Sequence, residues 1–130
     1  MGKTTARVLV FDAGPLIAIE RASSKMTALL ERCRDARARI LVPAPVLSQV
    51  WRDGKKQARL SSFLKLPGVE VVPMDSNYAK ASGVLCGLFG TQDPIDACVV
   101  VLAKRWEAIA VTSDLDDLTK LNASLKLIAV

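Results

Sequence analysis

Short apolar segments alternate with helix-like segments along the chain, and this alternation restricts the possible folds more than any other feature. Five segments have strand length and are nearly all apolar: residues 7–11, 40–42, 69–72, 109–112 and 125–130. Helix signals fill the intervals, at residues 15–21, 25–37, 45–52, 56–65, 77–89, 94–106 and 115–122. Strands without polar alternation are typical of a parallel sheet that is covered on both faces. We therefore predict a three-layer α/β/α fold with a central, mostly parallel sheet.

Size and composition agree with one globular domain spanning residues 1–130. The chain is 51% hydrophobic and 24% charged, which is ordinary for a folded protein. Its longest apolar run, residues 97–103, is too short to cross a bilayer, and residues 1–6 lack the apolar core of a signal peptide. The three cysteines show no zinc-binding spacing. We expect a soluble, cytoplasmic protein with no membrane partner, whose cysteines are small buried residues.

The sequence contains no histidine, so imidazole cannot serve as a base or a metal ligand. Carboxylates are therefore the remaining candidates for acid–base catalysis and for metal binding. Asp12 and Asp114 each follow a predicted strand. In parallel α/β sheets, ligands bind beyond the carboxyl ends of the strands, where the strand order reverses. We expect both aspartates to lie at that edge of the sheet.

A third acid comes from the helix predicted at residues 94–106. Asp93 suits the N-cap, Pro94 the first helical position, and Asp96 the third. Taken singly, each of these acids is explained by capping or by the helix dipole alone. Together, Asp12, Asp96 and Asp114 bring three separate segments to one predicted edge, which favours a shared site.

Clustered carboxylates raise one another's pKa unless a cation lies between them. With oxygen as the only donor, Mg²⁺ is the favoured ion and Mn²⁺ is possible. These ions bind substrate phosphates and activate water, which suits phosphodiester hydrolysis. The formal net charge of +5 agrees with a polyanionic partner.

Four blocks of this chain resemble, in order and spacing, those of PIN domains, and most closely those of VapC-type toxin ribonucleases. The blocks are VLVFDAGPLIAIER, VPAPVLSQVWR, QDPIDACVVVLAKR and VTSDLDDL. The resemblance spans nearly the whole chain. It implies an Mg²⁺- or Mn²⁺-dependent endoribonuclease, the toxin of a toxin–antitoxin pair, which hydrolyses RNA. It also implies an antitoxin that inserts a peptide into a groove of the toxin, and a homodimer.

Carried over by position, Asp12, Asp96 and Asp114 match the catalytic, metal-binding acids of the family. Asp117 matches a further metal-binding acid, with Asp116 a close competitor. Asp93, Asp116, Ser113 and Gln49 are further candidates for supporting roles around the metal.

Gln49 departs from the family pattern, because most members have glutamate there. A neutral amide gives the site one negative charge fewer. Three outcomes remain open: Gln49 holds water or phosphate, the site needs more Mg²⁺, or the protein is a weak or inactive nuclease. The alternative function is therefore a PIN-like module that binds RNA or protein without cleaving. The last alternative is an unrelated phosphoacceptor domain with Asp12 in an acidic pocket. Such a domain would have a lysine after a late strand, but no lysine directly follows residues 109–112.

Two basic clusters are candidates for contact with an RNA backbone. One comprises Arg52, Lys55, Lys56 and Arg59, and the other comprises Arg32, Arg34, Arg37 and Arg39. A solvated helix face is the competing interpretation for each cluster.

Overall fold

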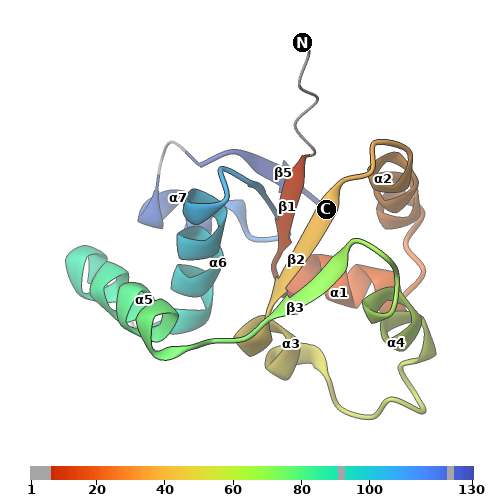
Figure 1. Cartoon of the computed structure of the whole chain (residues 1–130), viewed down its shortest axis with the longest axis horizontal. Helices are drawn as coiled ribbons and strands as arrows, with labels where there is room; N and C mark the ends of the chain where they lie inside the picture. The colour runs from red at the N-terminus through yellow and green to blue at the C-terminus, as the bar shows by residue number, and fades with distance from the viewer. Residues whose placement is uncertain (1–6, 91–92, 123–124) are drawn as a thin grey trace.

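The computed structural model describes residues 7–90, 93–122 and 125–130, which form a five-stranded parallel sheet surrounded by helices (Figure 1). The strand order is β3-β2-β1-β4-β5. The strands are β1 (Val8–Phe11), β2 (Arg39–Pro43), β3 (Val69–Val72), β4 (Ile109–Thr112) and β5 (Leu127–Ala129). The helices are α1 (Ala13–Glu20), α2 (Ser24–Asp35), α3 (Ala44–Val50), α4 (Ala58–Leu64), α5 (Ser76–Phe89), α6 (Pro94–Arg105) and α7 (Leu115–Leu121).

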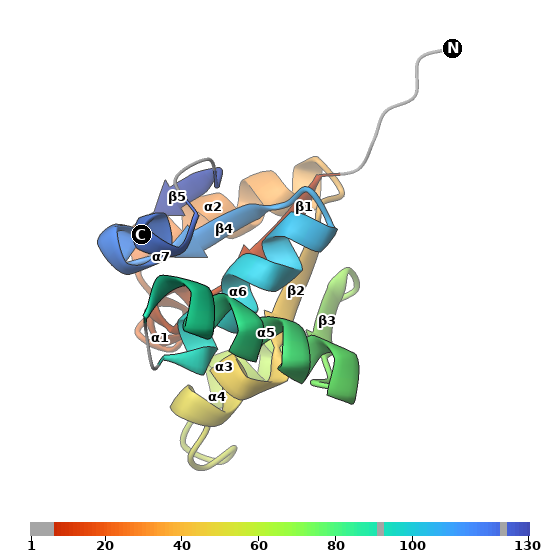
Figure 2. The same cartoon turned by 90° about the vertical axis from the view of Figure 1, so that its left-hand side faces the viewer.

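Helices cover both faces of the sheet, which confirms the predicted three-layer α/β/α fold. Figure 1 shows α1, α2 and α4 on one side and α5, α6 and α7 on the other. Helix α1 contacts β1 and β4 from its side, while α6 contacts β1, β2 and β4 from the opposite side. In the view of Figure 2, α5 and α6 lie in front of the sheet. Helix α3 contacts both α1 and α6 and so lies across one end of the sheet.

The central strands are apolar because both faces are covered. Val10, Phe11, Leu41 and Val111 are fully buried, and the Phe11 ring stacks on that of Phe63 from α4, with the ring centres 5.7 Å apart. Such burial is the main favourable contribution to folding. A continuous apolar strand therefore marks the middle of this sheet.

The expectation for the cysteines is confirmed at two of three positions. Cys33 and Cys98 are buried, and Cys86 is partly buried. Burial raises the pKa of Cys98 to about 12, so this thiol stays neutral and packs as a small apolar side chain.

Every predicted element boundary holds to within two residues, and the start of α1 is one of several that shift by two. We predicted a start at Pro15, but α1 begins at Ala13 because the Asp12 carboxylate accepts a hydrogen bond from the Ala13 N–H and caps the helix. Asp93 caps α6 as predicted. Gly90 ends α5 in the left-handed conformation, with φ of 65°, which glycine adopts without strain.

None of the helices in the described part of the chain is by itself long and apolar enough to cross a membrane. Taken together, α5 and α6 would pass on length and composition, but they meet at a bend of 111°.

The strand order reverses at the centre of the sheet. The chain moves from β1 to β2 on one side, and later returns to pair β4 with the other side of β1. The backbone N–H of Asp12 donates to the Val111 carbonyl at 3.0 Å. The carboxyl ends of β1 and β4 are thus adjacent, at the position where such sheets bind ligands.

Gly14 allows the start of α1 to lie against the loop that follows β4. A Cβ atom at position 14 would be 2.8 Å from the Ser113 Cβ and 3.0 Å from the Ser113 backbone nitrogen. Contacts this short cannot be relieved by rotating the serine hydroxyl, so glycine is the residue that fits here.

Gly14→Ala is therefore expected to lower the free energy of unfolding by about 1–3 kcal/mol, as in other overpacked sites. Gly83→Ala is the matched control, since a Cβ there meets nothing within 4 Å and alanine should stabilise α5 by about 0.5–1 kcal/mol. Urea unfolding measures both. Equal stabilisation by the two variants would contradict the tight contact at Gly14.

Candidate functional site

Asp12 is the most constrained acid at the carboxyl edge of the sheet. Its residue is only 6% exposed. One carboxylate oxygen accepts from the Ala13 N–H at 2.8 Å, and the other accepts from the Thr112 hydroxyl at 2.9 Å. A buried carboxylate with a donor on each oxygen has a defined orientation, and hydrogen bonds to its charged form offset its loss of hydration.

Thr112 joins the two central strands at their ends. Its side chain is fully buried, donates to Asp12, and accepts from the backbone N–H of Asp114 at 2.9 Å. The hydroxyl therefore holds the acid after β1 and the backbone of the acid after β4 in a fixed relation. We did not predict this link between the two strand ends from the sequence. The signal that we missed is a polar residue at the buried end of an otherwise apolar strand.

Asp96 lies in the first turn of α6 and is partly buried. The Asp93 carboxylate accepts from the backbone N–H groups of Ile95 and Asp96, at 3.0 and 3.2 Å. Burial, and then the charges of Asp93, Asp12 and Asp117, raise the pKa of Asp96 to about 7. The capping role predicted for Asp93 is confirmed, and Asp96 faces acids from two other segments.

Asp114 and Asp117 form the other part of the cluster. Asp114 is the N-cap residue of α7, and Asp117 lies in the first turn of that helix. Hydrogen bonding with Asp117, together with burial and the charges of Asp117 and Asp12, raises the pKa of Asp114. Four predicted site acids, Asp12, Asp96, Asp114 and Asp117, thus influence one another electrostatically.

These carboxylates lie at one edge of the sheet, but their side chains are not positioned to coordinate a metal ion together. Among the residues that the structure describes, no three Asp, Glu, Cys or His side chains are arranged to hold a metal ion. The donor set still fits Mg²⁺ or Mn²⁺, because it consists of carboxylate oxygens. Burial is the larger cause of the raised pKa of Asp96, and the charges of the neighbouring acids add to it. A cation would relieve this added repulsion.

The remaining predicted residues lie on the surface. Gln49 is exposed in α3, Ser113 is exposed in the loop after β4, and Asp116 is exposed in α7. Ser113 touches the start of α1 through Gly14. The roles proposed for Gln49, Ser113 and Asp116 around a metal stay predictions.

Thr112→Val is expected to destabilise the protein by about 2 kcal/mol, because it removes a donor to a buried carboxylate and leaves that oxygen unpaired. Thr112→Ser keeps the hydroxyl and should lose less than half as much. Chemical denaturation of both variants checks this. A valine variant as stable as the serine variant would show that the hydrogen bond from the Thr112 hydroxyl to Asp12 does not stabilise the fold.

The raised pKa of Asp96 predicts a pH-dependent stability in the absence of divalent cations. The native state keeps this proton up to about pH 7, whereas the ordinary value is 3.8, so stability falls as pH rises between these values. Asp96→Asn removes the effect. We expect the variant to exceed the parent by about 1 kcal/mol at pH 8, a value reduced for solvent screening, and to match it at pH 4.

Urea unfolding in a chelating buffer measures this difference. Asp35→Asn, at an exposed position on α2, is the matched control and should give no such gain at pH 8. A parent and an Asp96→Asn variant of equal stability at pH 8 would contradict the raised pKa of Asp96 and with it the combined effect of burial and neighbouring acids.

Comparison with known proteins agrees with this architecture. The PIN domain family model matches residues 9–123. VapBC2 from Rickettsia felis, solved bound to a DNA fragment from its promoter, is similar with a TM-score of 0.72 and 17% identity, over 95% of this chain and 98% of that chain. FitAcB from Neisseria gonorrhoeae has a TM-score of 0.61 and 16% identity, over 92% and 96% of the two chains.

FitAB bound to an IR36 DNA fragment has a TM-score of 0.63 and 12% identity, over 93% of this chain and 94% of that chain. A comparison with curated protein sequences found no match. Structural similarity at such low sequence identity shows a shared fold only. The family model, in contrast, matches most of the sequence and therefore identifies the family. The chain belongs to the PIN domain family.

Proposed function

We propose that this protein is a metal-dependent endoribonuclease that acts as the toxin of a toxin–antitoxin pair in the cytoplasm. The observation that carries the proposal is the meeting of acids from three segments of a PIN fold at the strand-order reversal. Asp12 follows β1, Asp114 follows β4, and Asp96 lies in the first turn of α6. PIN domains are generally nucleases, which supports hydrolysis as the reaction.

Asp12, Asp96, Asp114 and Asp117 are the residues that would hold Mg²⁺ or Mn²⁺. The ion would supply Lewis acidity to the scissile phosphate and to the attacking water. Asp12 contributes a carboxylate of defined direction, because the Ala13 N–H and Thr112 hydroxyl hold both its oxygens. Thr112 also fixes the Asp114 backbone, so the acids after β1 and β4 keep their spacing when RNA binds.

Gln49 favours the second candidate function, a PIN-like module that binds RNA or protein without cleaving it. Its side chain is neutral and exposed in α3, so it adds no negative charge to the cluster. We assign it a supporting role in an active enzyme, because the four aspartates alone offer enough oxygen donors for an ion that retains several waters.

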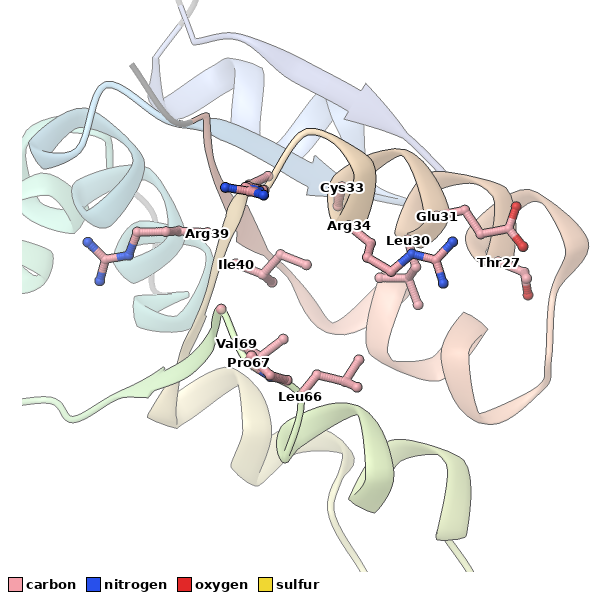
Figure 3. Close-up of a pocket in the computed structure, with 13 residues that line it drawn as sticks. Thr27, Leu30, Glu31, Cys33, Arg34, Arg39, Ile40, Leu66, Pro67 and Val69 are labelled. Carbon is pink, nitrogen blue, oxygen red and sulfur yellow. The ribbon is translucent and has the colours of Figure 1, made fainter. Parts of the chain in front are cut away.

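An apolar groove between α2 and the α4–β3 turn supports an antitoxin partner. Its volume is about 650 Å³, and Figure 3 shows Leu30, Ile40, Leu66 and Val69 facing its interior. A second hollow, of about 460 Å³, shares Leu30 and Leu66 and continues toward α1. Because Arg34 and Arg37 also line the groove, an amphipathic segment with acidic residues fits it best.

Helix α5 supports the expected homodimer. Val84, Leu88 and Phe89 are 63%, 74% and 55% exposed, which is unusual for such large apolar side chains in one helix. A second copy of the chain would bury this face by an isologous contact.

Purified protein is expected to cleave RNA with Mg²⁺ or Mn²⁺. Asp96→Asn should reduce the rate at least 100-fold, and circular dichroism should show an unchanged fold. Asp35→Asn, far from the cluster on α2, is the control and should keep full activity. RNA that stays intact at millimolar Mn²⁺, with the antitoxin removed, would reject the nuclease and favour the binding module.

Gln49→Glu is expected to lower the Mn²⁺ concentration needed for half-maximal cleavage by about 3- to 10-fold, because it adds a negative charge at a family glutamate position. Mn²⁺ titrations of cleavage, and of the Mn²⁺-induced rise in melting temperature, measure the effect. An unchanged or higher requirement would mean that position 49 does not face the ion.

A further inference from the structure

A basic segment runs from the end of α3 into the first turn of α4 and has a defined conformation. We call residues 51–59 the basic arm. It carries Arg52, Lys55, Lys56 and Arg59 against the single acid Asp53, so four positive charges and one negative charge leave a net charge of +3. All five side chains belong to exposed residues.

The Gln57 side chain stabilises the turn of the basic arm through hydrogen bonds to its backbone. Its side-chain carbonyl accepts from the backbone N–H groups of Arg52 and Asp53, at 2.8 and 3.1 Å, and its amide donates to the Val50 carbonyl at 2.8 Å. Gly54 lies against Trp51, where a Cβ would be 3.0 Å from the indole ring. One polar side chain thus satisfies three backbone groups and holds the turn in shape.

The cations of the basic arm are not neutralised by carboxylates. The Asp53 carboxylate accepts from the Lys55 backbone N–H at 3.0 Å. The Arg52 guanidinium donates to the Ser48 and Trp51 carbonyls. Within the described residues, the ion pairs are Arg34–Asp35 and Arg39–Glu70, both outside the basic arm. The Arg59 guanidinium donates to the Glu20 carbonyl at 3.4 Å. Carbonyl contacts leave the positive charges in place, so the four exposed cations remain available to an anionic partner.

The basic arm lies toward the same end of the sheet as the aspartates. It continues from α3, which follows the carboxyl end of β2 and contacts α1 and α6, the helices that begin beside Asp12 and Asp96. Figure 1 shows the α3–α4 connection at the lower end of the molecule, beyond the strand tips. The other basic cluster lies at the opposite end, where β2 begins, and its Arg39 is engaged by Glu70 and the Trp106 ring.

We propose that the basic arm binds phosphates of an RNA strand whose scissile bond lies at the aspartate cluster. This inference rests on the proposed function. An acidic cleavage site repels a polyanion, so attraction must come from cations nearby on the path of the strand. Lysine and arginine contacts to phosphate release counterions and supply affinity that does not depend on base sequence. Lys55 and Lys56, at the tip, are the principal contacts.

Binding of a single-stranded RNA oligonucleotide at several salt concentrations tests this role. The variants are Lys55→Gln/Lys56→Gln and, as the control, Lys104→Gln/Lys126→Gln, which removes two exposed lysines at the opposite end of the sheet. All are made with Asp96→Asn to prevent cleavage. The arm variant should lose about 1.4 from the slope of log affinity against log salt, with affinity at 0.15 M salt falling about tenfold. The control should lose neither.

The outcomes separate this inference from the proposed function. Equal slopes for the two double variants would overturn the basic arm as an RNA contact while wild-type cleavage upheld the nuclease. Wild-type protein that does not cleave would reject the nuclease, and the slopes would still decide the role of the arm. Loss of antitoxin binding by the arm variant, with an unchanged RNA slope, would overturn the inference and assign the arm to a protein partner.

Discussion

The buried hydrogen bond from Thr112 to Asp12 is the interaction on which the geometry of the candidate site depends. It joins residues that are 100 positions apart in the chain, and the same hydroxyl accepts from the Asp114 backbone. Because hydrogen bonds to a buried charge are stronger than neutral ones, the ends of β1 and β4 keep a fixed spacing. The close approach of Gly14 to Ser113 holds the start of α1 against the same loop.

The hydrogen bond from Thr112 to Asp12 brings acids close together, and these acids repel one another. Burial and then the neighbouring acids raise the pKa of Asp96, so the fold accepts a partly buried acid beside like charges at the position where a parallel sheet binds ligands. Stabilising residues elsewhere, above all the apolar strands, make this tolerable. Two clusters of positive charge lie apart from the acids, on the basic arm and along the groove beside α2. An acidic centre with basic surroundings matches the proposed requirements of a metal-dependent nuclease.

Much of the fold followed from local physical rules. The predicted bounds of β3 and β4 match the structure, because apolar β-branched residues between clear turn signals leave little choice. Asp93, Pro94 and Asp96 occupy the predicted positions of α6. The start of α1 was misplaced because Pro15 marks a first turn less sharply than the Asp12 cap. The family resemblance located the acids, but it carried no information on Gln57, whose bracing bonds depend on how the chain turns after α3.

The sequence by itself determined the α/β class and the PIN family and nominated the acids of the candidate site, since apolar periodicity, capping residues and motif order are all local properties of the chain. Tertiary structure alone decided which strands are neighbours, and therefore that Thr112 meets Asp12 and that Gly14 meets Ser113. It also separated two basic clusters that look equivalent in sequence, pairing Arg39 with Glu70 and Trp106 near the start of β2 and placing the basic arm at the other end of the sheet (Figure 1). The physical reason is that contacts between distant segments depend on strand order, which no local pattern encodes.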